Sequence, residues 1–344
     1  MTRYSLKSAL TGVLVMALAA AANAGVVFGN TGLTGGYRWD AAPRTIADVG
    51  ERSLDGGLRY SMQGGSFEAF RNLFSWTALP DVASFQTAVQ SAFDVWTKVD
   101  PVSGLGTNLY FVADLATSVV GANTGSGGLD IRGAEIDLFG STDAYFWNVG
   151  NTGTQGESSF TTIASTVTLT SGTTNYAGSR AIAGADIILN SNSGAVYSLN
   201  VFTRLLAHEI GHALGFGDIE GDINPGSFID DNFDSGDPLG TMTNSWAHLV
   251  DVYDPADSPL ALYNIGGAST TAGVDILMES RNLGISAANP LGNLSPMRND
   301  DYGTRQFLYP YIQSHPVPAP SVLALVMIGL CALCVSSRRG GGAG

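Results

Sequence analysis

Apolar residues recur every three or four positions along residues 81–101, and this spacing predicts an amphipathic helix with one apolar face. Asp81 is a suitable N-cap residue, and Pro101 cannot continue a helix, so both ends are predicted as well. The residues of the apolar face are Phe85, Val89, Phe93 and Trp96.

A second helix is predicted over residues 198–214. Ser198 or Asn200 can cap its start, because both side chains accept hydrogen bonds from backbone N–H groups. Gly215 can end it, because glycine readily adopts a left-handed backbone conformation. Residues 300–313 predict a final helix.

Strands are predicted where β-branched and aromatic residues gather or alternate with polar ones. These segments are residues 57–63, 107–114, 158–172 and 183–191. Residues 25–57 are rich in glycine and are predicted to be irregular. Residues 120–160 predict loops around a short strand, and residues 217–275 show little periodicity. Without a fixed-period repeat or an obvious linker, we expect one domain with loop insertions.

The N-terminal residues 1–24 have the layout of a secretory signal peptide. Two basic residues precede an apolar run, which closes with the small-x-small sequence Ala22-Asn23-Ala24. The run is too short for a comfortable membrane span. We expect cleavage after Ala24 and export of the protein.

The C-terminal residues 317–344 hold an apolar run, about residues 321–337, that can sit in a bilayer. Arg338 and Arg339 follow it and favour the cytoplasmic side. A plain C-terminal anchor or a buried helix is the alternative, and a buried helix fits poorly with a terminus of paired arginines and glycines.

The same tail, with its VPAPS sequence, apolar run and basic cluster, resembles the bacterial PEP-CTERM sorting signal. This resemblance implies a Gram-negative cell, transient anchoring in the inner membrane, and cleavage by an exosortase-like sorting enzyme. The protein would then reach the cell surface or the extracellular matrix.

The expected exported body, residues 25–316, is acidic and has no cysteine. All thirty Asp and Glu lie in it, against twelve of the sixteen Lys and Arg, so that twelve minus thirty gives a net charge of −18. Such a surface repels nucleic acid and anionic lipid, although solubility outside a cell also accounts for it. Cys331 and Cys334 lie in the tail, so the body has no disulfide, cysteine nucleophile or cysteine zinc ligand.

The sequence AHEIGHALGFGD, residues 207–218, carries the candidate chemistry. His208 and His212 lie on one face of the predicted helix, where both imidazoles can reach one zinc ion. Glu209 lies about 100° around the helix, beside the ion, where it can take a proton from water. A chance HExxH sequence is the alternative, but two of only four histidines at this spacing on a capped helix favour a zinc site.

Asp218 is the candidate third ligand. Gly215 can turn the chain back after His212, so that the Asp218 carboxylate faces the same ion. Alternatively, Asp218 caps a loop, as an aspartate beside a glycine often does.

The extended motif HExxHxxGxxD resembles that of the metzincin metallopeptidases, and the final aspartate resembles the snapalysin-like branch. The resemblance implies that His208, His212 and Asp218 bind zinc, that Glu209 is the general base, and that Met278 forms the methionine turn beneath the zinc. It also implies an α+β catalytic domain. This domain would have a twisted mixed five-stranded sheet, a backing helix and an active-site helix, plus loop insertions.

The order of the other segments resembles that of the matrixins over residues 55–312. Residues 184–190 resemble the edge strand that would bind the substrate backbone by β-pairing. Another zincin branch, with a later glutamate such as Glu279 as ligand, is an alternative that the spacing of Gly215 and Asp218 disfavours.

These observations predict an exported zinc-dependent endopeptidase that acts on a protein or peptide substrate. The alternative is a non-catalytic surface or extracellular-matrix binding protein on a metzincin scaffold. The intact Glu209 argues against this alternative. Calcium is a second candidate ion for residues 230–237, DDNFDSGD, where a solvated acidic loop is the other interpretation. His248 is interpreted as a surface or core residue.

Overall fold

The two long helices and most of the predicted strands are described in the computed structural model. It describes residues 36–99, 106–120, 131–142, 156–164, 166–169, 179–217, 277–278, 297 and 299–309. The chain divides into two units, Met1–Tyr311 and Ile312–Gly344, and every described residue belongs to the first. The two predicted targeting signals, residues 1–24 and 317–344, lie outside the described residues. No helix within the described ranges is long and apolar enough to cross a membrane.

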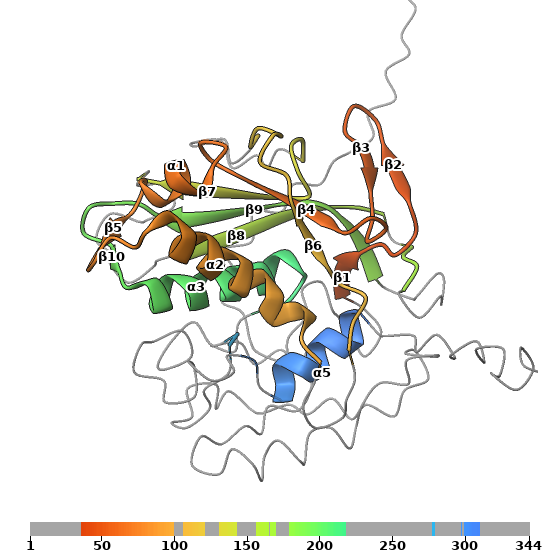
Figure 1. Cartoon of the computed structure of the whole chain (residues 1–344). Coiled ribbons are helices and arrows are strands. Elements are labelled where there is room, and N and C mark those ends of the chain that lie inside the picture. Colours follow the sequence, from red (N-terminus) through yellow and green to blue (C-terminus); the bar gives the residue numbers. More distant parts are fainter. Residues whose placement is uncertain are drawn as a thin grey trace, which may run out of the picture. The chain divides into compact units, whose positions relative to one another are not determined.

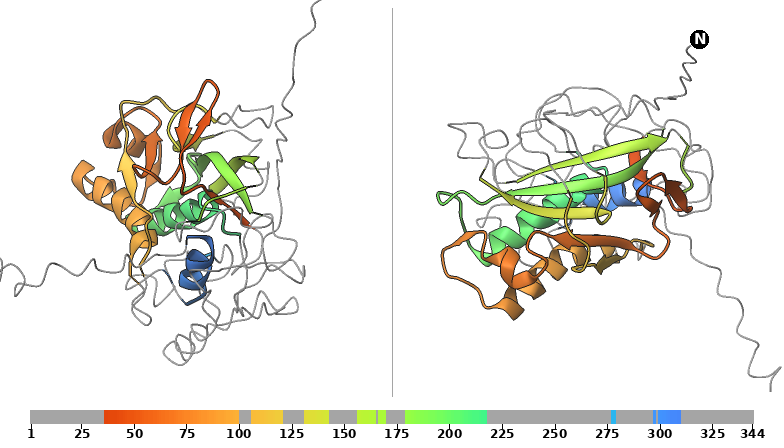
Figure 2. Two further views of the ribbon diagram at one scale, coloured as in Figure 1. Left: turned by 90° about the vertical axis from the view of Figure 1, so that its right-hand side faces the viewer. Right: turned by 90° about the horizontal axis from the view of Figure 1, so that it is seen from above.

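A mixed sheet forms the centre of the fold (Figures 1 and 2). In the described part of the chain it has six strands in the order β1-β9-β7-β4-β6, with β8 paired to β9. Only β8 runs antiparallel to its neighbour; the other pairs are parallel. The strands are β1 (Gly36–Trp39), β4 (Leu58–Met62), β6 (Phe111–Ala113), β7 (Ile136–Ser141), β8 (Gly156–Ala164) and β9 (Ser179–Asn190).

The sheet therefore has one strand more than the five predicted, and the extra strand is β1. Its four residues pair in parallel with Ser179–Ile182 at the start of β9. The prediction that residues 25–57 are irregular is wrong for this strand and for the antiparallel hairpin of β2 (Arg44–Ile46) and β3 (Gly50–Arg52). Strands of three or four residues are too short to show an alternating pattern.

The prediction that residues 184–190 form an edge strand is also wrong. They belong to β9, which pairs with β7 on one side and with β8 on the other. The apolar residues of β9 are buried without alternation, which is typical of an internal strand covered on both faces. On this side of the sheet, the outermost described strand is β8.

The two long helices agree with the sequence prediction. The helix α2 (Val82–Asp94) begins at Asp81, whose side chain accepts a 2.8 Å hydrogen bond from Ser84 N, and its predicted apolar face is buried. It ends in a 3-10 turn, Val95–Thr97, before Pro101 is reached. The helix α3 (Leu199–Ala213) is capped by Ser198 rather than Asn200.

Shorter elements complete the described fold. A final helix, α5, spans Asn299–Leu308, so it begins one residue before the predicted range of residues 300–313 and ends within it. The short helix α1 spans Phe67–Arg71, and β5 (Ser75–Trp76) pairs in parallel with β10 (Val196–Tyr197).

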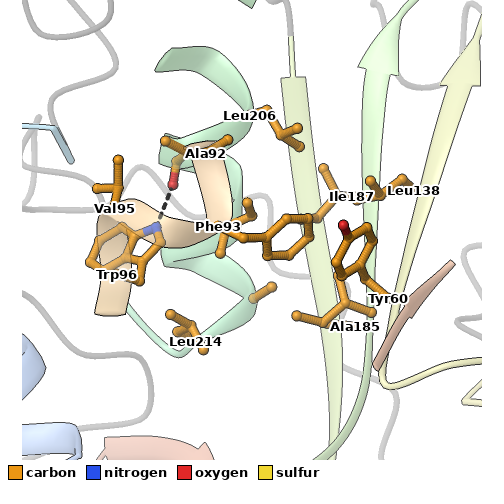
Figure 3. Close-up of a cluster of buried hydrophobic side chains, with 14 of the residues drawn as sticks. Tyr60, Ala92, Phe93, Val95, Trp96, Leu138, Ala185, Ile187, Leu206 and Leu214 are labelled. Atoms are coloured by element: carbon orange, nitrogen blue, oxygen red, sulfur yellow. Dashed lines mark hydrogen bonds between the residues drawn. The ribbon is translucent and has the colours of Figure 1, made fainter. Parts of the chain in front are cut away.

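The helices α2 and α3 pack side by side on one face of the sheet, and the main core lies between them and the strands (Figure 1). Figure 3 shows Phe93 of α2 against Tyr60 of β4, with the ring centroids 4.0 Å apart. Trp96 donates its indole N–H to Ala207 O of α3 at 2.8 Å. Trp39 of β1 donates in the same way to Ala213 O at 3.0 Å. Two indoles thus fix α3 at its middle and its end.

Candidate metal centre

The two histidines of the HExxH sequence lie one turn apart on α3 and direct the same ring nitrogen toward one point. The Nε2 atoms of His208 and His212 are 3.1 Å apart, and the ring planes stand at 86° to each other. Both side chains are buried. The structure therefore brings the two predicted ligands together at their Nε2 atoms.

Backbone carbonyls hold the other nitrogen of each ring. His208 Nδ1 lies 2.7 Å from Leu277 O, and His212 Nδ1 lies 2.9 Å from Phe216 O. A carbonyl only accepts, so in the neutral rings each Nδ1 carries the proton and donates it. Each Nε2 is then an acceptor nitrogen, and a backbone carbonyl at Nδ1 with an acceptor at Nε2 is the arrangement of metal-binding histidines in proteins.

The spacing of these nitrogens fits a tetrahedral zinc ion. Two ligands about 2.0–2.1 Å from such an ion lie about 3.3 Å apart. The observed 3.1 Å between the Nε2 atoms of His208 and His212 is close to this value. Two acceptor nitrogens at this distance repel each other, and a divalent cation between them would turn that repulsion into attraction.

The turn after α3 positions the carbonyl that holds His212. Gly215 has a φ of 97°, and its N–H donates to His212 O at 2.8 Å. Phe216 N then donates to Gly211 O at 3.0 Å, so the chain folds back over the helix end. A Cβ at Gly215 would stand 2.0 Å from Tyr37 O, so only glycine fits. Gly215 thus ends the helix as predicted.

A second segment, far along the chain, supports His208. Leu277 accepts the His208 proton through its carbonyl, and its own N–H donates to the Asp301 carboxylate at 3.0 Å. Met278, the next residue, is buried. Its sulfur packs against Gly211 of α3 so closely that a Cβ on Gly211 would lie 2.4 Å from it. The structure thus places Met278 beside the helix that carries both histidines, and its role as a methionine turn stays a prediction.

Glu209 lies on the side of α3 that faces the sheet and is buried. Ser158 of β8 has its hydroxyl 2.7 Å from Glu209 Oε2 and 2.9 Å from Glu209 O. Burial raises the pKa of the neighbouring Glu157 carboxyl above its ordinary value, and the charge of Glu209 raises it further. The Ser158 hydroxyl thus ties the Glu209 side chain to β8.

Sequence reasoning missed Ser158 and Gly156, the two β8 residues that contact the Glu209 carboxylate. Gly156 lies against the carboxylate so closely that a Cβ at this position would stand 2.2 Å from Glu209 Oε1. The sequence offers one local signal for these residues, which is that a glycine and a serine two apart on a strand lie on the same face. Nothing local relates that face to Glu209, which is 51 residues from Ser158.

The predicted third ligand is not among the described residues. Among them, no group of three or more His, Cys, Asp or Glu side chains lies where it could hold one ion. Asp218 lies outside the described residues, as do Glu279, His248 and the candidate calcium loop, residues 230–237. Comparison of the chain with family models, with curated proteins and with solved structures finds no match.

Proposed function

We propose that the protein is an exported zinc-dependent endopeptidase with a metzincin-like catalytic domain. The observation that carries the proposal is the pair of Nε2 atoms of His208 and His212, 3.1 Å apart, with both Nδ1 atoms held by backbone carbonyls. Asp218 is the proposed third ligand. The mixed sheet, the backing helix α2 and the helix α3 support the proposed domain class, as does the position of Met278 beside Gly211.

The proposed reaction is hydrolysis of a peptide bond. When bound, zinc would polarise the scissile carbonyl and acidify a water molecule. Glu209 takes a proton from the attacking water and passes it to the leaving amine nitrogen, which is general base and then general acid catalysis by one carboxylate. The hydrogen bonds at Nδ1 fix the tautomer and the orientation of both imidazoles, with Nε2 as the ligand atom.

The edge strand β8 is the proposed substrate-binding strand, in place of residues 184–190. Within the described residues, β8 pairs only with β9, so its outer edge can pair with an extended peptide. The same strand contacts Glu209 through Ser158. A peptide paired with β8 would therefore pass close to the proposed general base.

The test is a metal assay combined with a cleavage assay on the full chain. We expect about one zinc per chain, a ratio set by the single HExxH helix, and cleavage of an unfolded protein that a chelator abolishes and added zinc restores. Glu209→Ala should keep the zinc and lower the cleavage rate by about 10²- to 10⁴-fold. Undiminished cleavage by Glu209→Ala would contradict the mechanism.

Asp218→Ala tests the proposed third ligand, and we expect it to weaken zinc binding. Zinc content and cleavage equal to those of the unmodified protein would show that Asp218 is a loop residue. A folded protein that takes up no zinc from a zinc-replete medium would instead favour a non-catalytic surface or matrix binding protein.

Export and sorting are proposed from the sequence of residues 1–24 and 317–344. The mass and terminal sequences of the protein recovered from its native cells test this proposal. We expect an N-terminus at Gly25 and a C-terminus near the VPAPS sequence. A recovered chain that keeps both segments would contradict it.

A further inference from the structure

We infer that Gly156 and Ser158 of β8, named here the β8 pair, hold the Glu209 carboxylate in its catalytic position. Ser158 is a positioning residue that acts through Glu209, and Gly156 leaves the space that the carboxylate occupies. This inference rests on the proposed function and deepens it.

The Ser158 hydroxyl has one proton and two acceptors within reach. They are Glu209 Oε2 at 2.7 Å and Glu209 O at 2.9 Å. The carboxylate is charged, and hydrogen bonds to ionised acceptors are shorter and stronger than those to neutral carbonyls. The proton therefore goes to Oε2, which fixes one oxygen of the carboxylate to the strand.

The second carboxylate oxygen lies directly over Gly156. A Cβ at this residue would stand 2.2 Å from Glu209 Oε1 and 2.7 Å from Glu209 Cδ, far inside the 3.0 Å that real Cβ contacts respect. Gly156 does not have a positive φ, so its backbone conformation would suit other residues. Glycine is needed here for the space above it.

The β8 pair is a rigid support. Gly156 and Ser158 are two residues apart and so face the same side of the strand. They pair with Leu189 and Ile187 of the internal strand β9. A catalytic group held by residues on a paired strand is positioned more firmly than one held by a loop.

The zinc ligands depend on other atoms. His208 and His212 are oriented by the carbonyls of Leu277 and Phe216. Removal of the Ser158 hydroxyl should therefore leave metal binding intact and reduce only the steps in which Glu209 moves a proton. This predicts an effect on kcat without an effect on KM or zinc content.

The first test is steady-state kinetics of the zinc-loaded full chain. Ser158→Ala should lower kcat by about 10- to 100-fold, as expected when a catalytic group is misplaced by about 1 Å. Ser158→Thr should restore most of this loss, because it keeps the hydroxyl. Ser159→Ala is the matched control, since Ser159 faces the other side of the same strand.

Gly156→Ala should lower kcat at least as much, because its methyl group must displace the Glu209 carboxylate. Gly194→Ala is its control, since a Cβ at Gly194 meets nothing within 4 Å. If kcat of Ser158→Ala and Gly156→Ala equals that of the two controls, the inference is wrong.

The second test does not depend on activity. A double-mutant cycle of Ser158→Ala and Glu209→Ala is measured by chemical unfolding of the zinc-free protein. We expect the two changes to be coupled by about tenfold in the unfolding equilibrium constant. Simple additivity of the two changes would overturn the inference, whatever the kinetics show. Coupling in a protein that neither binds zinc nor cleaves peptides would uphold the contact and refute the proposed function alone.

Discussion

Two largely buried polar regions of this molecule differ in how their hydrogen-bond donors and acceptors are arranged. The arginine cluster consists of Arg52, Arg59 and Glu135, and in it donors point at acceptors. The histidine site consists of His208, His212 and Glu209, and in it two acceptor nitrogens face each other at 3.1 Å. The first arrangement is satisfied by its own hydrogen bonds, whereas the second directs two ring nitrogens to one point, where a cation could bind both. This contrast separates a group that stabilises the fold from one that we propose binds an ion.

The arginine cluster is closed by its own hydrogen bonds. Arg52 donates to Glu135 Oε1 at 3.1 Å and to four backbone carbonyls, those of Glu51, Ile131, Gly133 and Ala183. Arg59 binds both oxygens of the same carboxylate, at 2.8 and 3.1 Å. Burial lowers the pKa of Arg52, and the Glu135 charge opposes this by favouring the charged guanidinium. The cluster stabilises the junction of β3, β4 and β7.

The largest effect is expected from the loss of one facing nitrogen. His208→Ala should abolish cleavage and weaken zinc binding by more than the about 10- to 100-fold that loss of a second-shell partner costs. Calorimetric zinc titration measures this. The zinc-free variant should remain folded, because α3 keeps its contacts with Trp96 and Trp39. Unchanged zinc affinity would show that His208 is not a zinc ligand.

The arginine cluster should respond in the opposite way. Glu135→Gln leaves the Arg52 charge buried without its counterion, and breaking a buried ion pair in this way costs about 3–5 kcal/mol of unfolding free energy. Chemical denaturation measures this loss. Zinc affinity per folded molecule should stay the same, which serves as the internal control. A fall in zinc affinity equal to that of His208→Ala would show that the two regions are not independent.

Local chemistry made the helices and the histidine pair predictable from the sequence. The apolar spacing of residues 81–101 and the caps Asp81 and Ser198 act within one or two turns, so they can be read without knowledge of the fold. The same holds for the glycine turn at Gly215, whose left-handed conformation the sequence anticipates.

Contacts between distant segments were not predictable. Strand periodicity locates β9 but does not name its neighbours, and the resemblance to the matrixins predicts an edge strand where the structure has an internal one. The hydroxyl of Ser158 meets Glu209 across 51 residues, and Leu277 meets His208 across 69. Such contacts depend on strand pairing and helix packing, which leave no periodic trace in the chain.

A smaller effect is expected at the contact between α3 and Met278. Gly211→Ala places a methyl group 2.4 Å from the Met278 sulfur and 2.6 Å from the Trp96 ring. Overpacking of a buried contact costs about 1–3 kcal/mol. We expect this loss in denaturation together with weaker zinc binding, because Leu277, which orients His208, must move with Met278. Full stability and affinity in this variant would show that Met278 does not pack beneath the histidine site.

The smallest effect is expected at the exposed rim of the arginine cluster, where Asp114 meets Arg59 at 3.3 Å. A hydrogen bond from the Thr117 hydroxyl, and less so the charge of Arg59, lowers the pKa of Asp114 below 3.8. A carboxylate with a lowered pKa stabilises the fold above its unfolded pKa, and this stabilisation is lost as the pH falls through the lowered value. Solvent screening limits it to less than about 1 kcal/mol. Asp114→Asn should therefore differ from the unmodified protein in unfolding free energy at pH 6 and converge with it well below pH 3.8.

Burial raises the pKa of Asp137, so its contribution has the opposite sign and is lost as the pH rises above 3.8. Asp137→Asn is the contrasting variant, and the same pH trend in both would show that hydrogen bonding and burial do not act on these carboxylates as described.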